Sequence, residues 1–324
     1  MESKTKNKQE WGTLLKMAKR AFPGERGTEK EYTFRELKEG FFNAAYLVCL
    51  PSGKEAILKI APPKDAQIMT YEHGMMRTEV EAMRLVRAKT AVPVPEIFYY
   101  DPSGELCGSD YFFMEKLKGA SYASTREKLS SEERYRVEYE AGRYNRLMNE
   151  LEGEYFGIPG VPAQCGKSWK AAFGKIMEAL LKDGEQKKVD IGMDYDELRR
   201  ILEKHAGCLE EVKHPRFVHW DLWEGNLFQK DGRVTGLIDF ERALWGDPLM
   251  EHDFQGITRG EKNTPFLEGY GKTSFSSLEK EQRGLYNLHL FFIMTIECAY
   301  REYEDNSQYR WARRMLLEEK KILE

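Results

Sequence analysis

One short stretch of the sequence constrains the fold and the chemistry of this chain more than any other. His219, Asp221 and Asn226 lie within eight residues, and Asp239 follows Asn226 by thirteen positions. Short apolar segments on both sides of this loop predict two strands, residues 217–218 and 234–238. Taken alone, three polar residues this close together are more often a satisfied loop network than a reactive site. The downstream aspartate is what favours a functional reading.

The side chains of this stretch suit metal-assisted proton transfer. Asp221 and Asn226 are separated by a loop that contains Gly225, so both can turn toward one cavity, one as a proton acceptor and one as a metal ligand. Asp239 follows a buried strand, where its carboxylate can bind a hard cation such as magnesium through oxygen. The phosphates of a nucleotide would complete the coordination of that cation.

A lysine in the first third of the chain complements this stretch. Lys59 lies in the apolar segment 55–61, where an unpaired ammonium is costly to bury. Glu79, on the predicted helix that follows, is the expected partner, although Glu81 lies close by and the helix register stays open. Lys59 could also be an edge-strand residue with its head group in water. A Lys and Glu pair facing an Asp, Asn and Asp set is the arrangement that phosphoryl transfer needs.

The order of predicted elements divides the chain into two lobes. Turn residues and apolar runs predict a short helix at 11–22 and then a five-stranded layer that carries one helix. Three of the strands lie within 32–60, the helix at 71–89, and the other two strands at 96–101 and 110–117. Long amphipathic segments then predict helices at 130–151, 169–182 and 195–208, with a buried helix at 288–300. We therefore expect an α+β protein with an N-terminal lobe over residues 1–117 and a helical C-terminal lobe over residues 118–324.

The motifs resemble those of a known family. The pattern His219-x-Asp221-Leu-x-x-x-Asn226, followed by Ile238-Asp239-Phe240-Glu241, Gly246-Asp247-Pro248 and Asp253, is similar to that of the aminoglycoside phosphotransferase and choline kinase-like family. The resemblance covers about residues 30 to 300. It implies a bilobal protein-kinase-like fold whose N-terminal lobe is a five-stranded antiparallel sheet with a helix.

The same resemblance implies roles for individual residues. Asp221 would be the catalytic base, with Asn226 and Asp239 as magnesium ligands and Lys59 paired with Glu79 at the ATP phosphates. The other implied positions are the loop 40–43 with Asn43 over the nucleotide, the hinge 112–117 with Glu115 and Leu117 at the adenine, and His219 and Asp253 as supports of the catalytic loop. The cofactors would be ATP and Mg²⁺, and the acceptor a hydroxyl of a small molecule.

Differences from protein kinases narrow the choice of phosphate acceptor. Trp223 stands where many protein kinases have lysine, Glu241 replaces the glycine of the DFG motif, and no Ala-Pro-Glu segment follows Asp239. These differences favour a small-molecule acceptor over a peptide. The loop 40–43 also lacks the GxGxxG pattern of protein kinases. The sequence therefore does not define how this loop would cover the phosphates of the nucleotide.

Two further groups of residues bear on the acceptor. Trp220, Trp223 and Trp245 could form an aromatic cage for a cation, although core packing is the favoured reading. The carboxylates near the end of the buried helix could attract an amine-bearing acceptor or simply form a solvated face; they are Glu297, Glu302, Glu304 and Asp305.

Composition limits the remaining alternatives. The chain has 50 Lys and Arg against 54 Asp and Glu, spread along its length, which gives no reason to expect a nucleic-acid partner. The longest apolar segment, 285–296, is too short to span a membrane. Five cysteines without a CxxC pair and a charged N-terminus favour a cytoplasmic location.

Three rival functions remain open at this stage. They are a nucleotide-binding regulator without activity, a protein kinase, and a metal-dependent phosphohydrolase built on His219, Asp221 and Asp239. The preference for ATP or GTP, the acceptor and the oligomeric state are not fixed by any residue.

Overall fold

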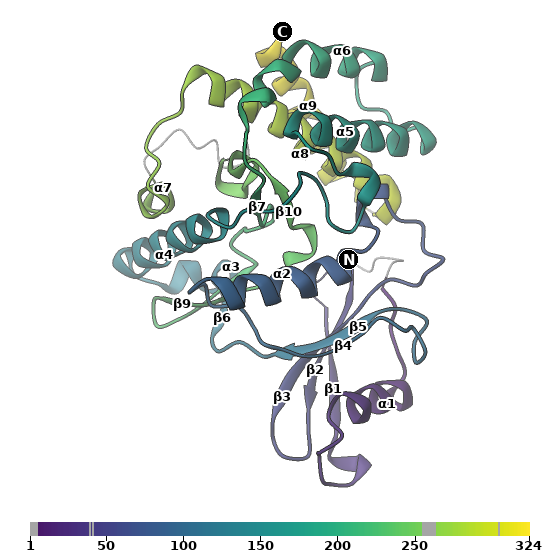
Figure 1. Ribbon diagram of the computed structural model, residues 1–324. Coiled ribbons are helices and arrows are strands. Elements are labelled where there is room, and N and C mark those ends of the chain that lie inside the picture. The colour runs from purple at the N-terminus through teal and green to yellow at the C-terminus, as the bar shows by residue number, and fades with distance from the viewer. Residues whose placement is uncertain (1–5, 39, 41, 255–263, 304) are drawn as a thin grey trace.

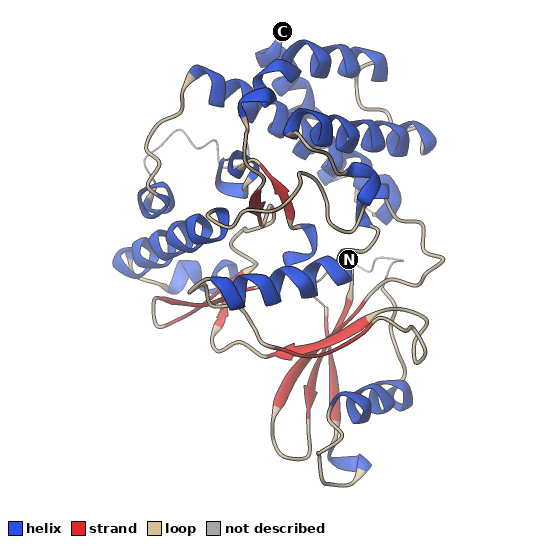
Figure 2. Ribbon diagram, viewed as in Figure 1, coloured by secondary structure: helices blue, strands red, loops and turns tan. Residues whose placement is uncertain are grey.

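The computed structural model describes residues 6–38, 40, 42–254, 264–303 and 305–324. A sheet-rich N-terminal part leads into a C-terminal part that consists mainly of helices (Figures 1 and 2). The predicted α+β class is confirmed. The exact division at residue 117 stays a prediction, as does the functional separation of the two lobes.

The N-terminal sheet has the five strands that the sequence predicts. They are β1 (Thr33–Leu37), β2 (Ala44–Cys49), β3 (Glu55–Ile60), β4 (Ile97–Asp101) and β5 (Tyr111–Glu115), in the order β1-β2-β3-β5-β4. All neighbouring strands in this sheet run antiparallel. Strand β3 therefore lies in the middle of the sheet, which excludes an edge-strand position for Lys59.

A helix covers each face of this sheet. Successive side chains of a strand point to opposite faces, and on β3 Leu58 and Ile60 belong to the core under α1 (Trp11–Ala21). The other face packs on α2 (Met75–Lys89), where Val80 and Met83 share a core with Phe112 of β5. Lys59 alternates with Leu58 and so faces α2. Figure 1 shows α2 between the sheet and the helical part.

Helix α2 begins later than the sequence pattern suggests. Residues Thr70–Glu72 form a separate 3-10 turn, η2, and Gly74 adopts a left-handed conformation with φ 74° before the helix starts. A residue with a side chain is strained at this φ. The break therefore falls at the glycine, and α2 starts at Met75, four residues after the predicted start at Tyr71.

The C-terminal part contains the predicted helices with small differences at their ends. Its α-helices among the described residues are α3 (Tyr122–Thr125), α4 (Ser131–Asn149), α5 (Trp169–Gln186), α6 (Tyr195–His205), α7 (Pro265–Tyr270), α8 (Ser277–Arg301) and α9 (Ser307–Leu323). Helix α8 is longer than the predicted 288–300 segment and is buried along most of its length.

Short strands in the C-terminal part are more numerous than predicted. One small sheet has the order β6-β8-β9, formed by β6 (Ala120–Ser121), β8 (Leu227–Lys230) and β9 (Arg233–Leu237). A second sheet pairs β7 (Arg216–Val218) with β10 (Leu244–Gly246). The two predicted strands thus lie in different sheets. Strand β8 was not predicted, because it is only four residues long and ends on charged Lys230.

A buried ion pair connects η2 with the end of α8. Arg301 donates to the carboxylate of Glu72, and their side chains are 1% and 0% exposed. Arg301 also lies over the ring of Phe42, with the guanidinium carbon 4.7 Å from the ring centroid. These contacts join the segment before α2 and the loop before β2 to the helical part.

We expect Arg301→Met to lower the free energy of unfolding by about 3–5 kcal/mol, because Glu72 would be left buried without its partner. Chemical denaturation measures this change. The double variant Glu72→Gln with Arg301→Met should recover a large part of the loss, since it removes both charges. Equal losses in the single and double variants would show that the arginine stabilises through packing alone.

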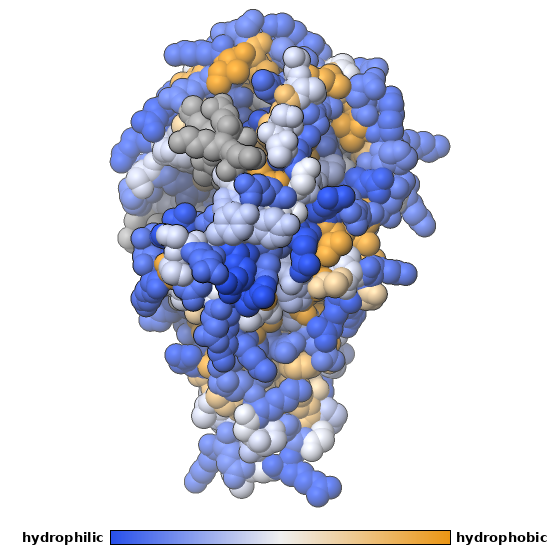
Figure 3. Space-filling model, turned by 90° about the vertical axis from the view of Figure 1, so that its left-hand side faces the viewer, coloured by the Kyte–Doolittle hydropathy of each residue, from blue (hydrophilic) through white to orange (hydrophobic). Residues whose placement is uncertain are grey.

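The face shown in Figure 3 is mainly hydrophilic, with apolar residues in small separate groups. Among the described residues, no helix combines the length and apolar character needed to cross a bilayer.

Candidate active site

The structure brings Lys59 together with its predicted partner Glu79 and also with Asp239. The Nζ of Lys59 lies 2.6 Å from Oε1 of Glu79 on α2 and 2.8 Å from Oδ1 of Asp239. The Lys59 side chain is 11% exposed, so water competes little for these bonds. Glu81 instead pairs with Arg77 on the outer face of the helix. The register of α2 thus selects Glu79, and the contact of Lys59 with Asp239 joins the sheet to the helical part.

Charge and burial oppose one another in this cluster. Burial acts to lower the pKa of Lys59, but the nearby carboxylates of Asp239 and Glu79 outweigh it and raise the pKa. For Asp239 burial acts to raise the pKa, while the Lys59 ammonium lowers it below its ordinary value. Burial raises the pKa of Glu79 to about 7. Lys59 is therefore a permanent cation at the centre of the group.

Glu241, which stands where the DFG motif has glycine, lies in the same cluster as Lys59 and Asp239 and was not predicted to belong to the site. Its Oε2 accepts a 2.6 Å hydrogen bond from Nδ2 of Asn43, a residue of the loop predicted to cover the nucleotide. Burial, followed by the charge of Asp239, raises the pKa of Glu241 to about 8. Its position two residues after Asp239 was the available signal. Phe41, in the same predicted loop, lies outside the described residues.

Asp221 and Asn226 face one another across their loop, as predicted. Nδ2 of Asn226 donates to the backbone oxygen of Asp221 at 2.8 Å and lies 3.4 Å from Oδ2 of the same residue. The backbone N–H of Ile238 donates to the carbonyl of Asn226 at 3.0 Å. This bond places the loop directly beside Asp239. Burial raises the pKa of Asp221 to about 6.

Two residues at this site adopt an unusual backbone conformation. Trp220 and Asp239 have φ of 69° and 67°, in the left-handed region that side-chain-bearing residues rarely occupy. Such strain persists where the surrounding structure holds it, often at functional sites. One of the two strained residues is the predicted magnesium ligand, Asp239, and the other, Trp220, directly precedes the predicted proton acceptor, Asp221.

His219 packs against the segment that carries Asp239 and so supports the loop that contains Asp221 and Asn226. Burial lowers its pKa to about 4, so the ring is neutral, and Nε2 lies 3.1 Å from the carbonyl oxygen of Ile238. The ring also packs against Phe240, with centroids 4.3 Å apart. This geometry matches the scaffold role implied by the resemblance.

Glu251, which the sequence analysis did not single out, holds the backbone of the loop. Its two carboxylate oxygens accept the N–H groups of His219 at 2.9 Å and Trp220 at 3.0 Å. Asn149 on α4 donates to the same carboxylate at 2.8 Å. Oδ2 of Asp253, which was also predicted as a support, lies 3.9 Å from Nδ1 of His252, and its role stays a prediction. The direct contacts show that Glu251 holds the backbone of this loop.

We expect Glu251→Gln to cost about 1–3 kcal/mol of stability, because one of two buried N–H groups would face an amide nitrogen. Turnover should fall as well, since the loop that carries Asp221 would loosen. Thermal unfolding and ADP release measure the two effects. Glu211→Gln makes the same chemical change at an exposed position and should alter neither. A fully stable Glu251→Gln protein would contradict this account of the loop.

The three tryptophans do not form a cage. Trp220 is buried and lies beside Arg242, with the guanidinium carbon 5.1 Å from the ring centroid, whereas Trp245 packs on Phe217 at 5.6 Å. Trp223 is 44% exposed. Core packing was the favoured interpretation, and it holds for Trp220 and Trp245.

One of the acidic residues near the end of α8, Glu297, forms ion pairs with arginines. Glu297 is buried, and its Oε1 lies 3.4 Å from both Arg242 and Arg301. Asp305 accepts from Ser307 at an exposed position, and Glu304 lies outside the described residues. Glu297 is therefore already paired, which weakens the idea that this group attracts an amine. Arg242, which was not predicted to belong to the site, is a partly buried cation beside this part of it.

The predicted hinge residues lie apart from the Lys59 cluster. Glu115 is the last residue of β5 and exchanges hydrogen bonds with Glu96, while Leu117 packs over Gly236 of β9. Phe112, on the same strand, pairs with Lys59 in the sheet. The segment thus runs from the cluster toward the helical part, and its contact with adenine stays a prediction.

The residues present fit a divalent cation. Carboxylate oxygens of Glu79, Asp239 and Glu241 lie within 4.8 Å of one another. Lys59 pairs with two of these groups, Glu79 and Asp239. Oε2 of Glu79 is buried and has no hydrogen-bond partner among the described residues. Carboxylate oxygens are the kind of ligand that magnesium takes up.

Fold and site together define a class of protein, the phosphotransferases with a protein-kinase-like fold. A lysine from an antiparallel sheet meets a glutamate from the adjoining helix and an aspartate that follows an HxDxxxxN loop. A family model described as the phosphotransferase enzyme family matches residues 33–252. The chain belongs to this family.

Solved structures with the same fold include antibiotic-modifying enzymes. A thermostable mutant of aminoglycoside phosphotransferase APH(4)-Ia in complex with ADP and hygromycin B has a TM-score of 0.63 and 16% identity, covering 95% of this chain and 97% of that one. A ternary complex of APH(2")-IIa with streptomycin and ATP has a TM-score of 0.59 and 15% identity, covering 96% and 94%. Identities this low establish the fold alone.

Among curated proteins, two similar sequences are Subtelomeric hrmA-associated cluster proteins from two strains of Aspergillus fumigatus. Each is 33% identical over 99 residues, which is 30% of this chain. The match spans 19% of the fungal protein, so it says little about the activity of the whole chain.

Proposed function

We propose that this protein is an ATP-dependent, magnesium-requiring kinase that transfers the γ-phosphate to a hydroxyl of a small molecule. The strongest support for this proposal is the position of Lys59. Its ammonium group forms ion pairs with both Glu79 of the N-terminal part and Asp239 of the helical part. The family membership and the nucleotide complexes of structurally similar proteins agree with it.

Each residue of the site has a role in this proposal. Lys59, oriented by Glu79, binds phosphate oxygens, and Asn43 lies over the phosphates once they displace its bond to Glu241. Asp239 and the Oδ1 of Asn226 would hold magnesium, which neutralises charge on the phosphates when bound. Glu115 and Leu117 belong to the segment that would contact adenine. Asn226 leaves its Oδ1 available because its Nδ2 already donates to Asp221.

Asp221 acts on the acceptor. Its carboxylate accepts the proton of the acceptor hydroxyl as the oxygen bonds to the γ-phosphorus and the bond to ADP breaks. Burial raises the pKa of Asp221 to about 6, which makes it a better proton acceptor than an exposed aspartate while it stays ionised at neutral pH. Positioning and charge neutralisation supply the rest of the rate.

An ADP-release assay over a panel of hydroxylated small molecules tests the proposal. Stimulation by one class of acceptor, dependent on Mg²⁺, is the expected result. ADP or phosphate release that no acceptor stimulates would favour the phosphohydrolase, and nucleotide binding without release would favour the regulator. Phosphorylation of generic peptides would favour a protein kinase.

A further inference from the structure

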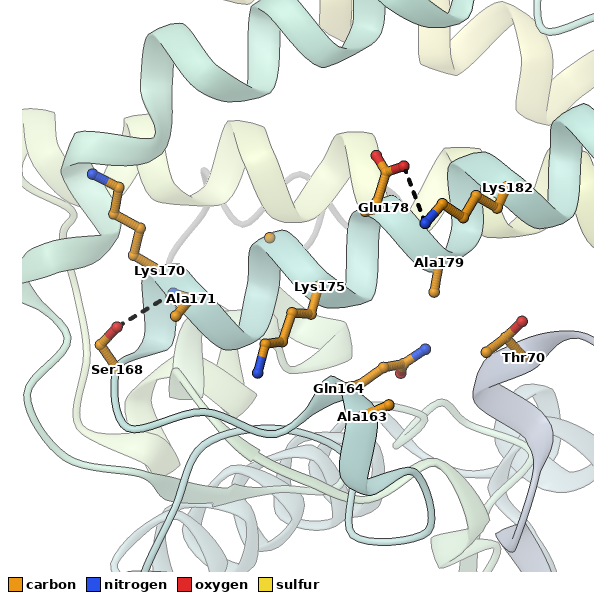
Figure 4. Close-up of a pocket in the computed structure, with 11 residues that line it drawn as sticks. Thr70, Ala163, Gln164, Ser168, Lys170, Ala171, Lys175, Glu178, Ala179 and Lys182 are labelled. Atoms are coloured by element: carbon orange, nitrogen blue, oxygen red, sulfur yellow. Dashed lines mark hydrogen bonds and ion pairs between the residues drawn. The ribbon is translucent and has the colours of Figure 1, made fainter.

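A groove with a volume of about 700 Å³ follows one face of α5, away from the site described above (Figure 4). Its lining includes Thr70 of η2 and Gln164, but none of the residues assigned to ATP, magnesium or the acceptor. The α5 residues Ala171, Gly174 and Ala179 line it. These positions share one side of the helix, and their small size leaves the face hollow.

The groove carries an excess of positive charge. Three lysines of α5 line it, Lys170, Lys175 and Lys182, against one lining carboxylate, Glu178. Lys170 is paired with Glu210, outside the lining, at 2.6 Å. Glu178 is shared between Lys182 at 3.7 Å and Arg199 at 3.2 Å. Exposed ion pairs of this kind are weak, so the lysines can turn toward another anion.

Lys175 is the most available of these cations. Its Nζ donates to the backbone carbonyl of Cys165 at 2.6 Å, and within the described ranges it has no carboxylate at ion-pair distance. A neutral carbonyl does not compensate its charge. An anion in the groove would do so.

Gln164 supplies a second and independent observation. Its side chain lines the groove, yet the residue is 2% exposed and neither atom of its amide has a hydrogen-bond partner in the part of the chain that the structure describes. Figure 4 shows this side chain between α5 and Thr70. Buried polar atoms are nearly always paired in folded proteins. A ligand that pairs with the Gln164 amide must therefore offer an acceptor for Nε2 and a donor for Oε1.

We propose that this groove binds a phosphorylated polyol. Phosphate oxygens would accept hydrogen bonds from Lys175 and from Nε2 of Gln164, and a hydroxyl would donate to Oε1. A fully deprotonated inorganic anion such as sulfate could satisfy the lysines but not Oε1, and an uncharged polyol could satisfy the amide but not the lysines. The volume falls in the range of small-molecule sites.

Isothermal titration calorimetry of the full chain with fructose 1,6-bisphosphate tests this site. We expect binding at one site per chain, weakened about tenfold by Lys175→Gln and by Gln164→Met. Lys30→Gln removes the same charge at an exposed position in the N-terminal part and should bind as the unaltered protein does. Saturation with AMP-PNP and Mg²⁺ should not displace the probe, because the two sites share no residue.

Gln164→Met also has a readout in stability. Methionine has nearly the same shape without the unpaired polar atoms, so the midpoint of thermal unfolding should stay unchanged or rise. A lower midpoint would show that the amide already has a partner within the protein, and would overturn the proposal.

Other results would overturn it as well. They are the absence of binding up to about 10 mM, equally tight binding of inorganic phosphate, and displacement of the probe by AMP-PNP. None of these results bears on the kinase activity proposed above, so the two proposals fail separately.

Discussion

Asp221→Asn should lower kcat by about 10²- to 10⁴-fold, the usual contribution of a positioned general base. Asparagine keeps the size of the side chain and can keep the contact with Asn226, but it cannot accept the proton of the acceptor hydroxyl. Nucleotide affinity and the midpoint of thermal unfolding should change little, because the Lys59 cluster and the bonds from Glu251 remain intact. ADP release with a productive acceptor measures the loss.

A matched control for this variant is Asp231→Asn. Asp231 is exposed in the turn between β8 and β9, with φ 54°, a conformation that asparagine tolerates well. This variant should keep full activity. Acceptor-stimulated turnover within about tenfold of the unaltered protein in Asp221→Asn would remove Asp221 from the role of base.

Asp239→Asn should abolish the magnesium dependence of nucleotide binding and lower turnover by about 10³-fold, since metal coordination stabilises the transition state by several kcal/mol. The substitution removes the carboxylate that would hold the cation and also breaks the ion pair with Lys59. Lys59 would remain bonded to Glu79, so the sheet side of the site should persist.

Calorimetry with AMP-PNP, with and without Mg²⁺, separates these effects. In the unaltered protein Mg²⁺ should tighten binding, whereas in Asp239→Asn the two titrations should agree. Asp231→Asn again serves as the control and should respond to Mg²⁺ normally. An undiminished response to Mg²⁺ in Asp239→Asn would show that the cation is held by other residues.

The parts of the fold that follow from local pattern could be predicted from the sequence. Alternating side chains and turn residues located the five strands, and helical periodicity located α4, α5 and α6. The pairing of Lys59 with Glu79 followed from the cost of burying a charge in an apolar strand. These features depend on neighbours within a few residues or on one strong physical constraint.

Contacts between distant segments could not be predicted in the same way. Glu251 reaches the backbone of His219 across 32 positions, and Asn43 reaches Glu241 across 198. Arg301 meets Glu72 across 229 positions. The local sequence does not give the partners of these residues, because those are set by how the two parts of the chain pack.

The short strands illustrate a second limit. Strands β6 and β8 have two and four residues, and they form because the chain segments meet in the fold rather than because of their own propensity. The loop with His219, Asp221 and Asn226 was nevertheless located correctly, since its motif residues depend on spacing rather than on strand length.

A crystal structure with AMP-PNP and Mg²⁺ tests the central claim most directly. We predict that the triphosphate lies against Lys59, with a magnesium ion bound by Asp239 and Asn226 and with Asp221 facing the γ-phosphate. A nucleotide bound elsewhere, with the Lys59, Glu79 and Asp239 cluster unchanged and free of metal, would contradict the account.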